Sequence, residues 1–107
     1  MEAACRGARE AGGRTVGILP GTDRAAANAF VDVAIPSGLG EARNALVVRA
    51  ADALIAVGGG YGTLSEIALA LKAGKRVVGL DSWEIEGVVA AADPQAAVAA
   101  VLADSLT

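Results

Sequence analysis

The stretch 53–66 constrains the fold more than any other part of the chain. The apolar run 53–57 has the length and composition of a buried parallel strand, and three consecutive glycines follow it. A helix is predicted to begin near Thr63. A strand, a glycine turn and a helix N-terminus in this order can hold an anion, because the first N–H groups of the helix point outward at its positive end. The sequence therefore predicts a ligand that carries a phosphate.

Predicted helices and strands alternate along the whole chain of 107 residues. We expect helices over 1–11, 41–51 and 63–72 and from Asp93 onward, and strands over 14–19, 31–35, 53–57, 76–80 and 88–91. One apolar face is predicted for the third helix, formed by Leu64, Ile67, Ala68 and Leu71. This alternation predicts one domain over 1–107, a three-layer Rossmann-like α/β fold with a mostly parallel sheet.

The chain starts inside a predicted helix, with no N-cap and no strand before it. In doubly wound sheets the ligand binds where the strand order reverses, beside the first strand. We therefore expect an N-terminal truncation, in which a strand and a second glycine turn precede Met1 in the complete domain. The alternative is that Met1 is the true start and that the first helix packs on an edge.

Composition excludes several functional classes. Nine basic and twelve acidic residues give a net charge of −3 with no basic run, so a nucleic-acid partner is not expected. No apolar stretch reaches the roughly 18 residues of a membrane span, and one cysteine without a signal peptide predicts a cytoplasmic protein. The chain has no histidine, which removes histidine bases and most transition-metal sites, so no metal site is predicted.

The glycine turn is not a P-loop, because no Gly-Lys-Ser/Thr follows it, and its spacing differs from the dinucleotide-binding pattern. Its alternative interpretation is a tight turn that needs a positive φ and binds nothing. The predicted phosphate-binding residues are Gly58, Gly59, Gly60, Tyr61, Gly62 and Thr63.

Thr63 and Glu66 have two interpretations. Thr-Leu-Ser-Glu matches a capping box, in which the threonine side chain is the N-cap and the glutamate bonds back to it. The functional interpretation places Glu66 on the first helical turn beside the anion site, where a carboxylate can bind a sugar hydroxyl or move a proton.

Arg43 is expected in the first turn of its helix, an unfavourable place for a cation, which points to a functional role or to a solvated surface side chain. Arg49 is interpreted as structural, paired with Asp52. Cys5 is interpreted as a small core residue. Weaker candidates lie in loops at the ligand-facing edge, namely Asp23, Arg24, Asn28, Trp83, Glu84 and Glu86.

The segment Gly59–Glu66 resembles the Gly-Gly-x-Gly-Thr-x-x-Glu signature of the LONELY GUY family, long misnamed lysine decarboxylases. In that signature a proline usually precedes the first glycine, and this chain has Gly58 there. Upstream, Arg43–Arg49 is similar to the second motif of that family, with Asn44 in place of its lysine. The sequence segments Gly17–Thr22 and Gly38–Asn44 are typical of the branch of this family that includes molybdenum cofactor carrier-like proteins.

The resemblance implies that Arg43 and Glu66 act on a nucleoside 5′-monophosphate and release a base and ribose 5-phosphate, with no cofactor required. It also adds Pro20, Gly21, Thr22 and Asn44 as weaker site candidates. The alternative is a non-catalytic carrier or sensor that binds molybdenum cofactor, a phosphorylated pterin, or a related nucleotide in the same place. Relatives of this kind are homo-oligomers, so an oligomer is expected.

Overall fold

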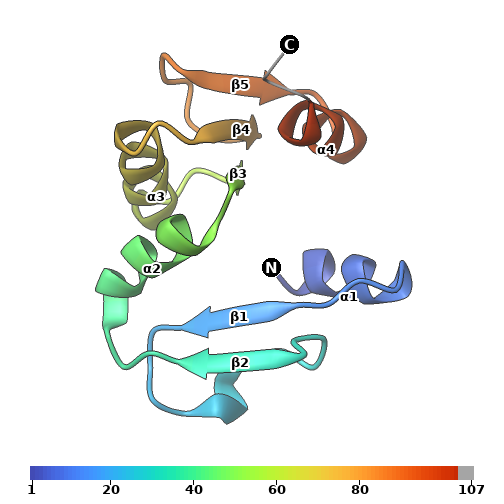
Figure 1. Ribbon diagram of the computed structural model, residues 1–107, viewed down its shortest axis with the longest axis vertical. Coiled ribbons are helices and arrows are strands. Elements are labelled where there is room, and N and C mark those ends of the chain that lie inside the picture. Colours follow the sequence, from blue (N-terminus) through green and yellow to red (C-terminus); the bar gives the residue numbers. More distant parts are fainter. Residues whose placement is uncertain (104–107) are drawn as a thin grey trace. The chain divides into compact units, whose positions relative to one another are not determined.

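The computed structural model describes residues 1–103 and divides the chain into two compact units, Met1–Arg43 and a second that begins at Asn44 (Figure 1). Both units are built from parallel strands and helices, which confirms the predicted α/β class. The strands form two hydrogen-bonded sheets, one in each unit, where the sequence predicted a single sheet.

The first unit contains α1 (Glu2–Glu10), β1 (Val16–Leu19), the short 3-10 turn η1 (Arg24–Ala26), β2 (Val33–Pro36) and a second 3-10 turn, η2 (Gly40–Ala42). Strands β1 and β2 pair in parallel, with Val16 opposite Val33. Helix α1 ends before Gly12, whose φ of +83° provides the predicted glycine stop. No residue of α1 is buried, so Cys5 is half-buried and not in a core, which corrects its interpretation.

Both strands of the first unit start about two residues later than predicted, because Thr15 and Asp32 bond to each other just before them. The Thr15 N–H donates to Asp32 Oδ2 at 2.8 Å, and the Asp32 N–H donates to Thr15 Oγ1 at 2.8 Å. The Thr15 N–H, assisted by the Thr15 hydroxyl and the cations Arg9 and Arg14, holds the pKa of Asp32 below its ordinary value against the effect of desolvation.

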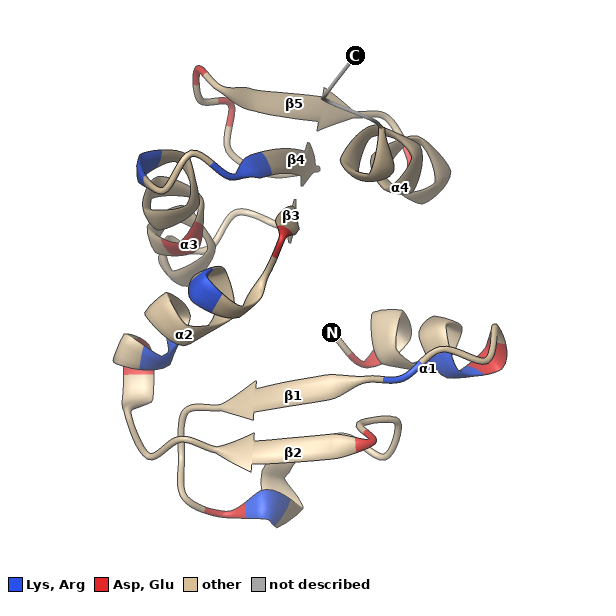
Figure 2. Ribbon diagram, in the orientation of Figure 1, with Lys and Arg blue, Asp and Glu red and all other residues tan. Residues whose placement is uncertain are grey.

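The second unit contains the rest of α2 (Arg43–Ala50), then β3 (Ala53–Val57), α3 (Tyr61–Lys72), β4 (Arg76–Leu80), β5 (Val88–Ala91) and α4 (Pro94–Leu102). The sheet order is β3-β4-β5, all parallel. Charged residues lie before or at the ends of these strands and not along them (Figure 2). This pattern is typical of parallel strands that helices cover on both faces.

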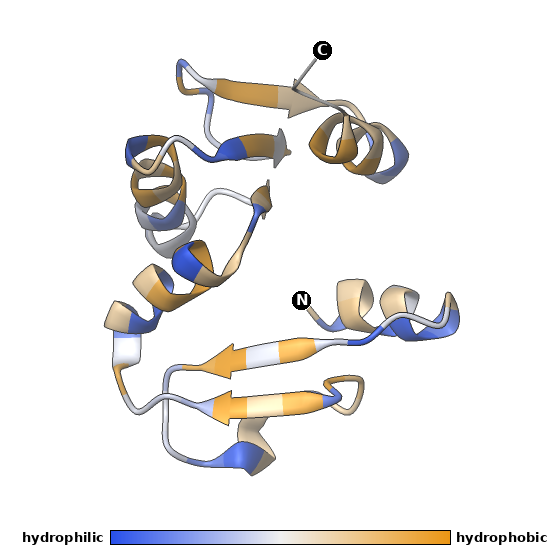
Figure 3. Ribbon diagram, in the orientation of Figure 1, coloured by the Kyte–Doolittle hydropathy of each residue, from blue (hydrophilic) through white to orange (hydrophobic). Residues whose placement is uncertain are grey.

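Helices α3 and α4 cover opposite faces of β4. Val77 packs in one cluster with Ile67 and Ala70 of α3 and Val48 of α2. Val78 is equally buried but points to the other face, where α4 packs against β4. The second unit therefore has three layers. Figure 3 shows the hydrophobic colouring of β5, the strand at the upper edge of this unit in that view.

The apolar face of α3 differs from the predicted one in a single member. Ile67 is buried as predicted, but Ala68 is exposed, and Ala70 is fully buried in its place. The helix begins at Tyr61, two residues earlier than expected. It ends as predicted at Gly74, which has a φ of +74°.

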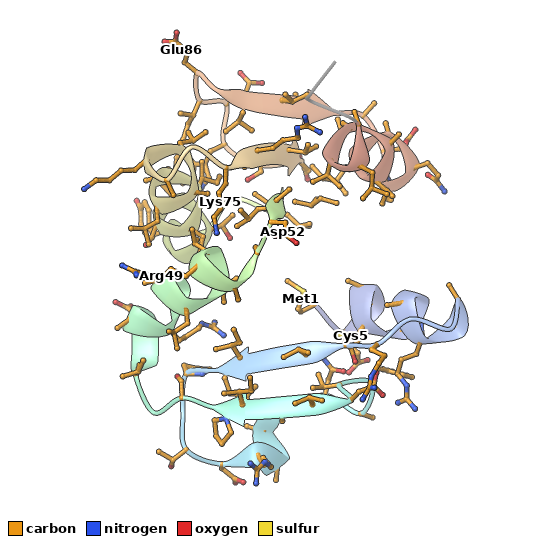
Figure 4. The ribbon with its side chains drawn as sticks, viewed as in Figure 1. Met1, Cys5, Arg49, Asp52, Lys75 and Glu86 are labelled. Carbon is orange, nitrogen blue, oxygen red and sulfur yellow. The ribbon has the colours of Figure 1, made fainter. Side chains whose placement is uncertain are left out.

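Two helix ends in the second unit are held by side chains. Asp93 Oδ1 accepts from the Ala96 N–H at 2.7 Å and Pro94 opens α4, which confirms the predicted N-cap. The ammonium of Lys75 donates to three carbonyl oxygens at the C-terminal end of α2, those of Val48, Arg49 and Ala51 (Figure 4).

The predicted pairing of Arg49 with Asp52 was wrong for the part of the chain that the structure describes, where no such ion pair forms. Lys75 occupies the end of α2 instead, and nothing in the sequence pattern pointed to it.

Candidate functional site

The predicted anion site lies at the junction of β3 and α3. Gly58 has a φ of +83°, and its N–H donates to the Leu80 carbonyl at 3.3 Å, so the turn is anchored to the end of β4. A Cβ atom added at Gly59 or Gly60 would meet no heavy atom within 4 Å. Packing therefore does not require glycine at these two positions, and their missing side chains leave open space in front of the helix.

Helix α3 begins after a glycine N-cap. Gly60 is the N-cap residue, and it has no side chain to bond to the first helical N–H groups. The capping-box prediction was therefore wrong, because Thr63 is the third helical residue and Glu66 lies on the second turn, not on the first. The first N–H groups of α3 face outward with the positive end of the helix dipole, as an anion site requires.

Asn44 lies beside this turn. Its side chain is buried, and its Nδ2 atom is 3.9 Å from the position that a Cβ atom on Gly62 would take. Helix α2 thus brings a buried amide to the first turn of α3, which places this weak sequence candidate within the candidate site.

Trp83 connects the glycine turn to the loop between β4 and β5. Its indole Nε1 donates to the Gly60 carbonyl at 3.1 Å, and its ring stacks on Tyr61 with centroids 6.1 Å apart and an interplanar angle of 25°. Tyr61 is 83% exposed, so the pair presents an aromatic surface next to the helix N-terminus. The sequence placed Trp83 on the correct edge but could not identify its partner.

A cavity of about 530 Å³ has Trp83 in its lining. Its lining residues come from the end of β4, the loop that follows and β5: Gly79, Asp81, Ser82, Trp83, Glu84, Ile85, Glu86, Val88, Ala90 and Ala91. The prediction that Trp83, Glu84 and Glu86 line a pocket is confirmed. Asp81 holds a left-handed backbone with a φ of 50°, and the Ser82 hydroxyl is buried without a partner in the described chain.

The remaining candidates lie in the first unit. The turn that contains Pro20 and Gly21 is bonded to the loop before α2, because the Gly40 N–H donates to Pro20 O at 2.8 Å and the Gly38 N–H to Gly21 O at 2.9 Å. The methyl group of Thr22 lies 3.2 Å from the Cβ position of Gly38. These three residues, Pro20, Gly21 and Thr22, shape a loop at the end of β1.

Arg43 has a structural contact. Its half-buried guanidinium donates from Nη1 to the Ile18 carbonyl of β1 at 2.6 Å. This bond explains why a cation is tolerated at the start of α2. The catalytic role that the resemblance implies for Arg43 stays a prediction, as does that of Glu66.

Two absences belong to the part of the chain that the structure describes. Residues 1–103 contain no group of three or more histidine, cysteine or acidic side chains that could hold a metal ion. Within the same range, no helix is long and apolar enough to cross a membrane.

Comparison with known proteins gives one family. The family model described as LDcluster4, SLOG cluster4 family, matches residues 1–105. An uncharacterized protein of Archaeoglobus fulgidus is 50% identical over 99 residues, which are 92% of this chain and 65% of that protein. The chain therefore spans less than two thirds of that relative's length.

Two similar solved structures carry functional names. The molybdenum cofactor binding protein of Rippkaea orientalis has a TM-score of 0.86 and 39% identity, over 94% of this chain and 68% of its own. The molybdenum cofactor carrier protein of Chlamydomonas reinhardtii has a TM-score of 0.79 and 41% identity, over 94% and 67%.

Proposed function

This chain belongs to the SLOG cluster4 family, and on that premise we propose that it binds a phosphorylated pterin of the molybdenum cofactor type and holds it without cleaving it. The observation that carries the proposal is the open glycine turn, where Gly59 and Gly60 leave room in front of a helix N-terminus without a side-chain cap. A phosphate placed there accepts hydrogen bonds from the N–H groups of Tyr61, Gly62 and Thr63.

The surroundings of the turn suit a flat, polar ring. Tyr61 and Trp83 offer an aromatic surface on which a fused ring can stack. The adjoining cavity carries the carboxylates of Asp81, Glu84 and Glu86. A pterin carries an amino group and a ring N–H, which are hydrogen-bond donors, and ionised carboxylates are acceptors.

The names of the similar structures support the carrier alternative. Both describe proteins that bind or carry molybdenum cofactor. The hydrolase activity, which the sequence resemblance placed first, has no comparable support, and the Arg43 guanidinium that it needs donates to a strand carbonyl. Hydrolysis and a homo-oligomeric state stay predictions.

The test is retention of the ligand. We would incubate the chain without oxygen with molybdenum cofactor released from a molybdoenzyme, desalt it, and measure molybdenum by mass spectrometry and pterin by fluorescence. We expect both to elute with the protein. Gly59→Asp places a carboxylate at the anion site and should reduce retention about tenfold or more, because like charges oppose each other there.

Gly7→Asp is the matched control, since a Cβ atom at Gly7 also meets nothing within 4 Å and the position lies in α1. Equal retention by both variants would reject the glycine turn as the site, and no retention by the wild type would reject the carrier proposal. In parallel, a panel of nucleoside monophosphates would be analysed for free base. Base release that Glu66→Gln abolishes would replace the carrier proposal with the hydrolase.

A further inference from the structure

We propose that the edge of β3 that faces away from β4 is a strand-addition site. Among residues 1–103, β3 has only β4 as a hydrogen-bonded neighbour, although α3 and α4 both pack against it. Cover by two helices is typical of a strand inside a doubly wound sheet, which has a neighbour on each side. The residues of β4, which has two neighbours, are buried at its centre, whereas none of the β3 residues is.

The backbone groups available for pairing follow from one hydrogen bond. The Gly58 N–H donates to Leu80, so in a parallel ladder Leu54 and Ala56 also direct their N–H and C=O groups toward β4. Ala53, Ile55 and Val57 alternate with them and direct theirs toward the open edge. Val57 is 57% exposed at the end of this edge. An added strand thus finds donors and acceptors at every second residue.

The strands of the first unit show how an edge is protected in this chain. On β2, the outward Ala34 carbonyl accepts from Arg24 Nε at 3.4 Å, and Pro36 has no N–H to offer. On β1, the outward Ile18 carbonyl accepts from Arg43. The sequence of β3 has no charge and no proline, as its uncharged colouring in Figure 2 shows. A long-lived open edge of this composition would be an aggregation site.

The occupant is an extended apolar segment that runs parallel to β3, of the kind encoded in the longer relatives outside the region that this chain matches. It is apolar because α3 and α4 already cover the two faces beside which it must lie. It is parallel because every strand pair of the described chain is parallel. The archaeal relative has the chain to supply it, since the match covers 65% of that protein.

The probe is a set of overlapping synthetic peptides that cover the Archaeoglobus fulgidus protein outside the matched 99 residues. Amide hydrogen exchange of the 107-residue chain is followed by NMR with each peptide in turn. Without peptide, the amides of Leu54 and Ala56 should exchange slowly and those of Ile55 and Val57 quickly. With the correct peptide, Ile55 and Val57 should slow by about tenfold, the value of one net hydrogen bond, while the β5 amides stay unchanged.

Two variants separate backbone from side chain. Ile55→Pro removes an outward N–H, which edge strands tolerate, and should abolish the protection, whereas Ile55→Val keeps the N–H and should retain it. A nitroxide at the N-terminus of the peptide should broaden Ala53 more than Val57.

Three results would overturn the proposal. Protection by no peptide would reject the site, and stronger broadening at Val57 would reject the parallel direction. Protection that appears without peptide and grows with protein concentration would identify a second copy of the chain as the occupant. The wild-type measurement decides the first point even if the proline variant does not fold.

Discussion

Replacing Lys75 by methionine should destabilise the second unit more than the same replacement of Lys72, the other lysine of the chain. The three N–H donors of the Lys75 ammonium match three carbonyl oxygens, at 2.6 Å from Val48, 3.2 Å from Arg49 and 2.6 Å from Ala51. These carbonyls lie at the negative end of α2, where that of Val48 also accepts the Ala51 N–H at 3.3 Å. Methionine keeps the length of the side chain and removes every donor.

The magnitude follows from these contacts. Hydrogen bonds from a charged group contribute about 1.5–3 kcal/mol each. Because Lys75 is only half-buried, we take the lower end of this range, and the two short bonds together then contribute about 3–4 kcal/mol. Ordering the lysine side chain costs about 1.5–2 kcal/mol, which methionine also pays in part. We therefore expect a net loss of about 2 kcal/mol. With a urea dependence of about 2 kcal/mol per molar, the midpoint of unfolding should fall by about 1 M.

Urea unfolding followed by tryptophan fluorescence measures this loss in the correct unit, because Trp83 is the single tryptophan of the chain. Lys72→Met is the matched control, since Lys72 lies exposed on the last turn of α3 and its replacement should change stability by less than about 0.5 kcal/mol. Equal midpoints for the two variants would refute the capping role of Lys75.

Three further outcomes are expected. Gly58→Ala should cost about 1–2 kcal/mol because the position has a φ of +83°, whereas Gly59→Ala, in open space without that constraint, should unfold like the wild type in urea. Near neutral pH, Asp32→Asn should have a lower melting temperature than the wild type, as measured by circular dichroism. The gap should close as the pH falls through the lowered pKa of Asp32, because a lowered pKa stabilises the fold only while the carboxylate is ionised; a constant gap would contradict this. Asp93→Ala removes an N-cap and should cost about 1 kcal/mol in the same melts.

Local patterns predicted the elements of this fold well. The apolar run 53–57, the strand 76–80 and the short strand 88–91 form as β3, β4 and β5. Apart from Arg76, which opens β4, their residues are apolar or glycine in succession, and a glycine or charged residue lies within two positions of each end, so neighbouring residues largely determine their limits. Asp93 was identified in the same way, because an N-cap bonds to a residue three positions away.

Long-range bonds explain what the sequence did not predict. Thr15 and Asp32 are 17 residues apart and shorten two predicted strands by bonding to each other. Lys75 bonds to carbonyls 24–27 residues before it. Trp83 bonds to Gly60 across 23 residues. Carbonyl acceptors of this kind occur at every residue, so no pattern of residue types indicates which one a distant side chain will select.

The capping-box error bears directly on the candidate site. A threonine N-cap at position 63 would have bonded the first N–H groups of the helix with its own side chain. The helix instead begins at Tyr61 after a glycine N-cap, which has no side chain to donate or accept. A side-chain cap takes one of the first N–H groups from which a bound anion would otherwise accept a hydrogen bond. The start at Tyr61 therefore places the first N–H groups of the helix at Tyr61, Gly62 and Thr63, and the Trp83 bond to Gly60 stabilises the turn in that arrangement.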